Sequence, residues 1–297
     1  MTGAAPQATL EMPTLFGAAD TAASDYQKRF FVAKTIELGA IALGAIVGAL
    51  NVNALWGAAG VAAVICFGIA LAIRLSGVGA RAERRWYDAR AAAESIKSLA
   101  WSYAVGGEAF RKSMPDAERE LVTKLGEILA GLPDLNVPAD ARTPAGATPD
   151  MAELRASDQQ TRCDRYHAAR INDQVSWYSN KSKFNKARSE AWSAAVVVAE
   201  GAAIVAGLLR MRGAFDVDLL GVFGAIGAGM IAWMQAKNYT SLSEAYAVTS
   251  HEVGLVAHSV RSGVPEDQWA QSVHDAEAAF SREHTMWRAR QQGRQVA

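Results

Sequence analysis

Two carboxylates stand inside apolar stretches of this chain, and their positions favour a chemical role. Glu200 lies near the middle of the run EAWSAAVVVAEGAAIVAGLL, and Glu37 lies near the start of TIELGAIALGAIVGALNV. A carboxylate at the centre of a membrane span costs about 2.5–3.5 kcal/mol, and each neighbouring Val, Leu or Ile returns only about 0.3–0.6 kcal/mol. We therefore expect Glu200 to face protein or a water-filled passage rather than lipid.

Two roles are open for Glu200, and two for Glu37. Glu200 could line or gate a pore, or it could form a neutral hydrogen bond that locks helices together. Glu37 stands one turn inside its run and close to Lys34, so snorkelling toward the membrane surface competes with a pore-lining role. Both glutamates are our candidates for pore-lining or gating residues.

The residues that usually bind metals or act as nucleophiles are scattered. Cys66 and Cys163 have no partner at metal-ligand spacing, and the five histidines form no H-E-x-x-H motif. The sequence has no glycine-rich phosphate loop, nucleophile elbow or Ser/His/Asp set. We expect no metal, no cofactor and no catalytic residue, and hence no enzyme. The 30 basic and 30 acidic residues balance, which gives no electrostatic case for a nucleic-acid partner.

Aromatic and charged side chains recur on the polar segments. Aromatic rings supply much of the area of any helical core, so burial in a bundle competes with a ligand cage. Arg90 and Glu94 are four residues apart on one helix face, which fits either an ordinary surface pair or a buried pair that holds a closed state. The candidates for a cytoplasmic bundle are Trp86, Arg90, Glu94, Trp101, Trp177, Glu252, Glu283 and Trp287.

Four apolar stretches must position these residues, at 35–52, 54–75, 190–209 and 219–236. Each is about as long as a spanning helix of 17–25 residues. Backbone amides in hydrocarbon must bond within their own segment, so the fold class is all-α, an integral membrane protein with two transmembrane hairpins. A water-soluble helical bundle is the alternative, but its helices would carry a charged face.

Small residues on the spans predict close helix packing. Gly44 and Gly48 form a GxxxG pair in the first span, and Gly221, Gly224 and Gly227 recur along the fourth. Because glycine has no side chain, helix backbones can approach each other closely at these positions. The packing is either within one chain or between subunits.

Basic residues near the span ends predict the orientation. Lys34 precedes the first span and Arg74, Arg84 and Arg85 follow the second, whereas the turn between them is uncharged. The positive-inside rule therefore places both termini and the long polar helices in the cytoplasm. The second hairpin follows by analogy, since its turn carries two arginines and two aspartates.

The chain divides into two units of similar layout. We predict a flexible N-terminal tail at 1–24, a first two-span unit at 25–131, a proline-rich linker at 132–150 and a second two-span unit at 151–297. In the second unit, residues 151–188 have no obvious breaker and predict one helix that runs directly into the third span. Each unit repeats the order hairpin, long polar helix, break and further helix.

Both units carry residues that resemble the SLATT superfamily, the two-transmembrane effector domains associated with SMODS nucleotidyltransferases and SLOG sensors. The first unit has RWYDAR at 85–90, AESIK at 93–97 and WSY at 101–103. In the second unit, the matching residues are Arg165, Tyr166, Arg170, Ile171, Asp173, Gln174, Trp177, Tyr178, Asn185, Glu277, Glu283, His284 and Trp287. The chain therefore resembles two tandem copies.

The resemblance implies a membrane effector of bacterial conflict and anti-phage systems, located in the inner membrane. Such an effector would form a homo-oligomeric pore or disrupt the lipid bilayer when a nucleotide second messenger or an upstream sensor protein triggers it. Two other functions stay open: a non-conducting scaffold that recruits partners through its cytoplasmic bundle, and a small-solute transporter with parallel repeats.

Overall fold

The computed structural model describes residues 9–49, 56–132 and 146–280, and in these ranges every regular element is a helix. The elements are α1 (Thr14–Ala49), α2 (Trp56–Ser76), α3 (Val78–Val105), the short 3₁₀ helix η1 (Glu108–Phe110), α4 (Ala117–Ala130), α5 (Pro149–Ala156), α6 (Gln159–Tyr166), the π-helical turn η2 (His167–Ile171), α7 (Asn172–Met211), α8 (Leu219–Lys237) and α9 (Tyr239–Ala257). Residues 266–280 are also helical. The predicted all-α fold is confirmed.

The helices form two compact units. The span unit comprises Tyr26–Arg84 and Lys183–Ser243, and the polar unit comprises the described parts of Met1–Asp25, Arg85–Ser182 and Glu244–Ala297. Both units draw on both halves of the sequence. The boundaries predicted at 25–131 and 151–297 therefore divide the chain in a different way from its compact units, and as sequence boundaries they stay a prediction.

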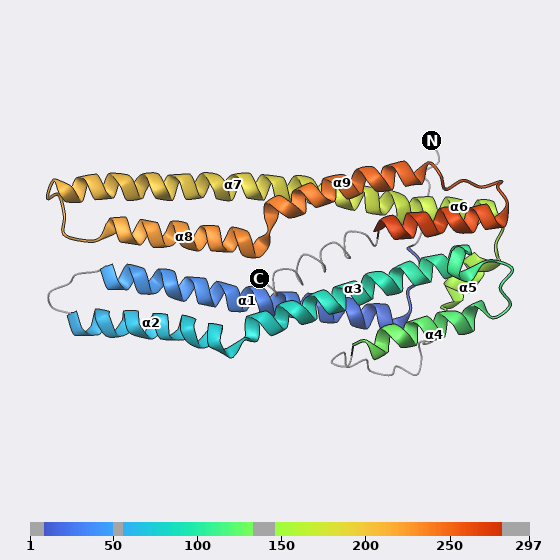
Figure 1. The fold of residues 1–297 in the computed structure, drawn as a ribbon, viewed down its shortest axis with the longest axis horizontal. Coiled ribbons are helices and arrows are strands. Elements are labelled where there is room, and N and C mark those ends of the chain that lie inside the picture. Colours follow the sequence, from blue (N-terminus) through green and yellow to red (C-terminus); the bar gives the residue numbers. More distant parts are fainter. Residues whose placement is uncertain (1–8, 50–55, 133–145, 281–297) are drawn as a thin grey trace, which may run out of the picture. The chain divides into compact units, whose positions relative to one another are not determined.

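In the span unit, α1 lies beside α2 and α7 lies beside α8 (Figure 1). Among the described residues, four helices that overlap the four predicted stretches are long and apolar enough to cross a membrane. Their large side chains point outward, with Val64 71% exposed and Val198 71% exposed. A soluble bundle would bury such side chains, because exposing a Val or Leu to water forfeits about 1.5–3 kcal/mol. This outward apolar surface supports the membrane interpretation over the water-soluble alternative.

Local signals set most helix ends. Gly106 follows the last residue of α3 and has φ of +75°, a left-handed conformation that glycine adopts without steric cost. Thr148 caps α5, since its hydroxyl accepts a hydrogen bond from the Met151 N–H, and Pro149 occupies the first turn. Gly263 and Pro265 lie in the break between α9 and the helix over residues 266–280.

Two expectations about helix extent were wrong. α1 begins at Thr14, so residues 14–24 are helix rather than flexible tail. Leu15, Ala19 and Ala23 are buried because their four-residue spacing places them on one helix face, a pattern hidden by the many small residues around them.

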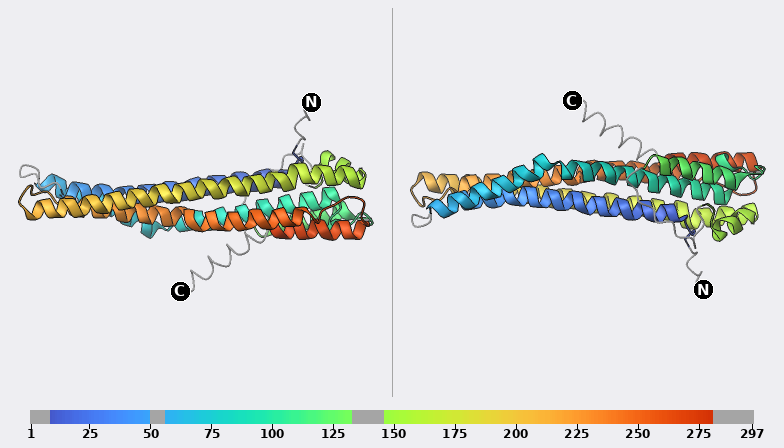
Figure 2. Two further views of the ribbon diagram at one scale, coloured as in Figure 1. Left: turned by 90° about the horizontal axis from the view of Figure 1, so that it is seen from above. Right: turned by 90° about the horizontal axis from the view of Figure 1, so that it is seen from below.

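The second correction concerns the helix predicted over residues 151–188. α5 ends at Ala156, and the carboxylate of Asp158 accepts a hydrogen bond of 2.8 Å from the Thr161 N–H, which starts a new helix. Ser157 is the C-cap of α5, and Asp158, a strong N-cap, follows it directly, so one helix ends and the next begins without Gly or Pro. From Gln159 onward the helix is continuous to Met211, as Figure 2 allows the reader to follow.

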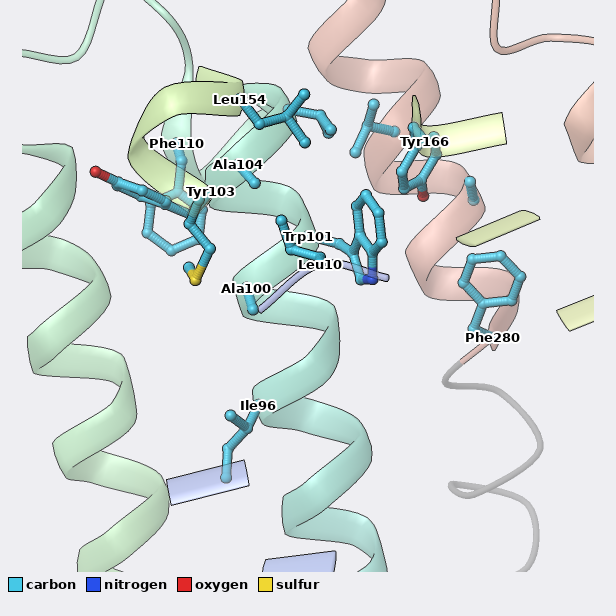
Figure 3. Packing of buried hydrophobic residues seen from close by; sticks show 14 of the residues in the cluster. Leu10, Ile96, Ala100, Trp101, Tyr103, Ala104, Phe110, Leu154, Tyr166 and Phe280 are labelled. Carbon is cyan, nitrogen blue, oxygen red and sulfur yellow. The ribbon is translucent and has the colours of Figure 1, made fainter. Parts of the chain in front are cut away.

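The polar unit has an aromatic core. Trp101 projects from α3 and meets Tyr166 of α6 edge to face, with 5.7 Å between the ring centroids (Figure 3). Tyr103 and Phe110 form a second edge-to-face pair at 5.8 Å. Such pairs contribute about 0.5–1.5 kcal/mol beyond the area that they bury. The core therefore holds α3, α6 and η1 in fixed positions around the polar groups described next.

Candidate functional site

Glu37 lies between α1 and α2 and is 4% exposed. One carboxylate oxygen lies 2.8 Å from a guanidinium nitrogen of Arg74, and the other lies 3.1 Å from the Lys34 ammonium. The carboxylate is thus neutralised between the two helices of the first hairpin. This position favours a clamp at the end of the hairpin over the pore-lining role predicted from the sequence, which stays a prediction.

Glu200 lies on the exposed face of α7. Its neighbours one turn away, Val197 (67% exposed) and Ile204 (63% exposed), lie on the same face. No hydrogen bond or ion pair of Glu200 occurs among the described residues. The four spans of one chain therefore provide no partner for the carboxylate predicted to face protein or water.

The glycines contact their neighbours to different extents. A Cβ atom at Gly44 would lie 3.2 Å from the Cβ of Cys66, so α1 and α2 approach closely there, and at Gly48 it would lie 3.7 Å from the Cβ of Ala63. Gly227 is buried and faces Ala199 across the second hairpin at 3.9 Å. Of the other two candidates, Gly221 lies against the Asp218 carboxylate that caps α8, and Gly224 has open space around it.

An aromatic cluster joins α1 to α8 near one end of the spans. The Lys237 ammonium lies 3.3 Å from the ring centroid of Phe31 and 5.0 Å from that of Trp233. The two rings pack edge to face at 5.9 Å. Trp and basic residues concentrate where spans meet the membrane surface, so this cluster fits an interfacial belt.

A cavity of about 540 Å³ opens at the other end of the span unit. Small residues of α1, α2 and α8 form much of its wall, and Arg210, Asp216 and Asp218 contribute the charges. Arg210 and Asp218 pair at 2.7 Å. Among the described residues, no group of three or more His, Cys, Asp or Glu side chains could hold a metal ion.

The polar unit contains a buried ionic group, the Glu277 cluster of Ser98, Tyr166, Arg170 and Glu277. Arg170 is 1% exposed and donates from Nε to one carboxylate oxygen of Glu277 at 3.0 Å and from Nη2 to the other at 2.6 Å. The Tyr166 hydroxyl donates to Glu277 at 2.8 Å, and the Ser98 hydroxyl also donates to it. Bidentate Arg–carboxylate pairs are among the strongest hydrogen bonds in proteins.

Arg162 forms a second buried contact between the same elements. It is 1% exposed, donates to the Val105 carbonyl at 2.7 Å and pairs with Glu266 at the start of the helix over 266–280. The indole N–H of Trp269 donates to the same carbonyl at 2.7 Å. The end of α3, the start of α6 and the helix over 266–280 are therefore joined through one carbonyl.

The predicted bundle candidates occupy varied positions. Trp101 is 1% exposed, whereas Trp86, Trp177 and Glu252 are half-buried. Arg90 is 35% exposed and pairs with Glu94 at 2.7 Å and with Asp20 at 3.4 Å, so the pair is partly buried, and a role in holding a closed state stays a prediction. The remaining two candidates, Glu283 and Trp287, lie outside the described residues.

Lys97 lies close to the Glu277 cluster. Burial and the neighbouring Arg170 guanidinium lower the pKa of its ammonium from the ordinary value. A second cationic side chain therefore lies near the buried Arg170 guanidinium, which carries an electrostatic cost for this core.

Sequence reasoning did not select Arg162, Arg170 or Glu277 as site residues. Glu277 follows Arg170 by 107 residues along the chain, so no spacing rule connects them. A signal existed for two of them, because Arg170 and Glu277 were among the residues that carried the SLATT resemblance. A charged residue among aromatic residues of the same motif, such as Arg170 between Tyr166 and Trp177, is the pattern that would have selected them.

Comparison with known protein families agrees with this architecture. Residues 13–163 match the family model described as SMODS and SLOG-associating 2TM effector domain 3, and residues 166–287 match the one described as SMODS and SLOG-associating 2TM effector domain 1. The chain is a tandem SLATT protein. No curated protein and no solved structure matches it.

The tandem SLATT assignment gives the fold a functional class. SLATT domains are two-transmembrane effector domains associated with SMODS and SLOG proteins, and two copies account for the four candidate spans. This SLATT chain is a multi-pass membrane protein with a helical polar unit. The Glu277 cluster lies within the second SLATT domain apart from Ser98, which the first domain supplies.

Proposed function

We propose that this tandem SLATT protein is a homo-oligomeric, pore-forming membrane effector. The observation that carries the proposal is the outward position of Glu200 on α7. A carboxylate near the centre of a span is costly in lipid, and the other spans of its own chain do not cover it. A second copy of the chain, or a water-filled passage between copies, would relieve that cost.

The charge balance of the spans supports conduction of cations. Glu37 is neutralised by Lys34 and Arg74, whereas Glu200 has no partner among the described residues. Copies arranged around an axis would contribute one Glu200 each, and rings of Asp or Glu select cations in channels. Val197 and Ile204 would then lie at or near the contact between copies.

The trigger would act from the cytoplasm. The polar unit is a packed helical core with buried ion pairs, so it suits a receiver of a signal from a nucleotide second messenger or a sensor protein. Lys34 lies at the start of the first span and Arg74 at the end of the second, and these basic residues support an inner-membrane location with cytoplasmic termini.

Ion flux into vesicles that contain the purified full-length chain tests the proposal. We expect cation flux, and we expect Glu200→Gln to reduce the cation-to-anion permeability ratio at least threefold. Glu190→Gln is the matched control, because it removes a different exposed carboxylate, one that lies near the start of the same span rather than near its centre. Vesicles that stay tight after addition of cyclic dinucleotides, and chains that stay monomeric in lipid, would refute the pore and favour a scaffold.

Oligomerisation has its own test. The substitution Ile204→Cys should give disulfide-linked dimers in oxidised membranes when Cys66 is replaced by Ala. Ala199→Cys is the control, since Ala199 is buried against Gly227 within one chain. Dimers from both variants alike would indicate random collision rather than a defined interface.

A further inference from the structure

The helix that carries the third span contains a π-helical turn. Gln159–Met211 is one continuous helix, and within it residues His167–Ile171 form η2, where the Asn172 N–H donates to the His167 carbonyl five residues earlier. A single π turn holds one residue more than an α turn. Such turns are rare and occur frequently at functional sites, so a specific set of contacts should hold this one.

Side chains of the turn bind one segment of the chain, residues 260–280. The bidentate pair to Glu277 comes from Arg170, inside the turn, and the hydroxyl that donates to the same carboxylate comes from Tyr166, immediately before it. A ring nitrogen of His167 lies 2.7 Å from the Val260 carbonyl. The Arg170 guanidinium also lies 4.4 Å from the ring centroid of Phe280.

The direction of the Arg170 side chain depends on the extra residue that the π turn inserts into the helix. An α-helix turns about 100° per residue, so loss of the π turn would rotate the following helix by about 100° relative to α6 and advance it by about 1.5 Å. Arg170 and Glu277 hold the turn because their two hydrogen bonds require the present direction of the Arg170 side chain. Without that pair, the ordinary α hydrogen bonds favour the rotated helix.

We propose that Glu277 is a positioning residue that holds the π turn, and that release of Glu277 from Arg170 rotates α7 and so re-aims the third span. The coupling is a property of the fold. Its consequence for permeability rests on the proposed pore, in which the rotation would move the Glu200 face and open the path. The helix over 266–280 then acts as the element through which a signal reaches the membrane.

The rotation predicts an exchange of exposure along α7. When the π turn becomes an α turn, each later residue moves to the position that the next residue in the chain holds now. Phe184, now 51% exposed, would take the buried place of Asn185, and Asn185, now 6% exposed, would take the exposed place of Lys186. Unfolding would instead expose both positions.

The test uses the full-length chain in lipid vesicles, with Cys66→Ala and Cys163→Ala removing the native thiols. Phe184→Cys or Asn185→Cys is then added, and a water-soluble maleimide labels the new thiol. The pair is removed with Arg170→Met and Glu277→Leu together, which leaves no unpaired charge in the core. Asp267→Asn is the control, since it removes a carboxylate of the same helix that is 80% exposed.

We expect removal of the pair to speed labelling of Asn185→Cys at least tenfold and to slow labelling of Phe184→Cys at least tenfold. Deletion of Ala169 should reverse both changes, because it removes the extra residue and restores the present direction of α7 without the ion pair. Asp267→Asn should change neither rate. Unchanged rates, faster labelling at both positions, or failure of the deletion to reverse the exchange would each overturn the proposal.

Dye leakage from the same vesicles separates this inference from the proposed function. Leakage that appears on removal of the pair and disappears on deletion of Ala169 supports both. An exchange of labelling without leakage supports the positioning role of Glu277 and counts against the pore. Leakage without the exchange of labelling overturns the positioning role and leaves the pore in place.

Discussion

Removal of the Glu277 carboxylate alone should weaken the polar unit severely. Glu277→Ala leaves the Arg170 guanidinium 1% exposed with neither of its two hydrogen bonds to a carboxylate, and the Tyr166 hydroxyl loses its acceptor. Loss of one partner of a buried ion pair costs about 3–5 kcal/mol, because the remaining charge stays out of water. We expect the free energy of opening of the polar unit to fall by that amount.

Cys163 is the probe for this prediction. It is 6% exposed in α6, close to the cluster, and with Cys66→Ala it is the single thiol of the chain. When opening and closing are fast, the labelling rate of a buried thiol follows the population of the open form. Since about 1.4 kcal/mol corresponds to a factor of ten, Glu277→Ala should speed labelling roughly 150- to 5,000-fold.

Two further variants decide whether the buried charge is the cause. Arg170→Met together with Glu277→Leu should label Cys163 far more slowly than Glu277→Ala does, since apolar replacement of a buried pair is often neutral or stabilising. Asp267→Ala removes an exposed carboxylate and should change the rate less than about fivefold. The reasoning fails if Glu277→Ala stays within fivefold of the parent, or if the apolar double variant labels as fast as the single one.

Three other predictions follow from the same structure. Burial and Arg170 lower the pKa of Lys97, so the folded chain binds fewer protons than the unfolded chain near that pKa. The free energy of unfolding should therefore rise with pH until the unfolded pKa near 10.5. Thermal unfolding in detergent should show this slope, and Lys97→Met should remove it. Gly106 and Gly263 share a left-handed backbone, but a Cβ at Gly106 would lie 2.9 Å from an Arg162 nitrogen and at Gly263 would meet open space, so Gly106→Ala should cost about 1–2 kcal/mol more than Gly263→Ala by chemical denaturation. Glu37→Ala should lower the free energy of unfolding of the span unit in detergent by about 1–3 kcal/mol. The loss should fall toward the lower end of that range, because Arg74 is exposed and water solvates it in the variant. A variant as stable as the parent would contradict the clamp.

The sequence by itself determined the features that depend on neighbouring residues. Apolar stretches of spanning length fixed the number of spans, because hydrocarbon forces each backbone to satisfy its own hydrogen bonds. Gly106 and Pro265 lie at the ends of polar helices for local conformational reasons. The motifs at 85–103 and 165–178 identified the SLATT resemblance, which the family matches confirm.

The tertiary structure alone decided which faces meet. Glu200 was found from the sequence, but its outward direction depends on how α7 packs against its neighbours. The Glu277 cluster joins side chains from residues 98 to 277, and the π turn inserts one residue into a segment whose composition is that of an ordinary helix. These features follow from contacts between residues distant in the chain, whose free energy no local pattern encodes.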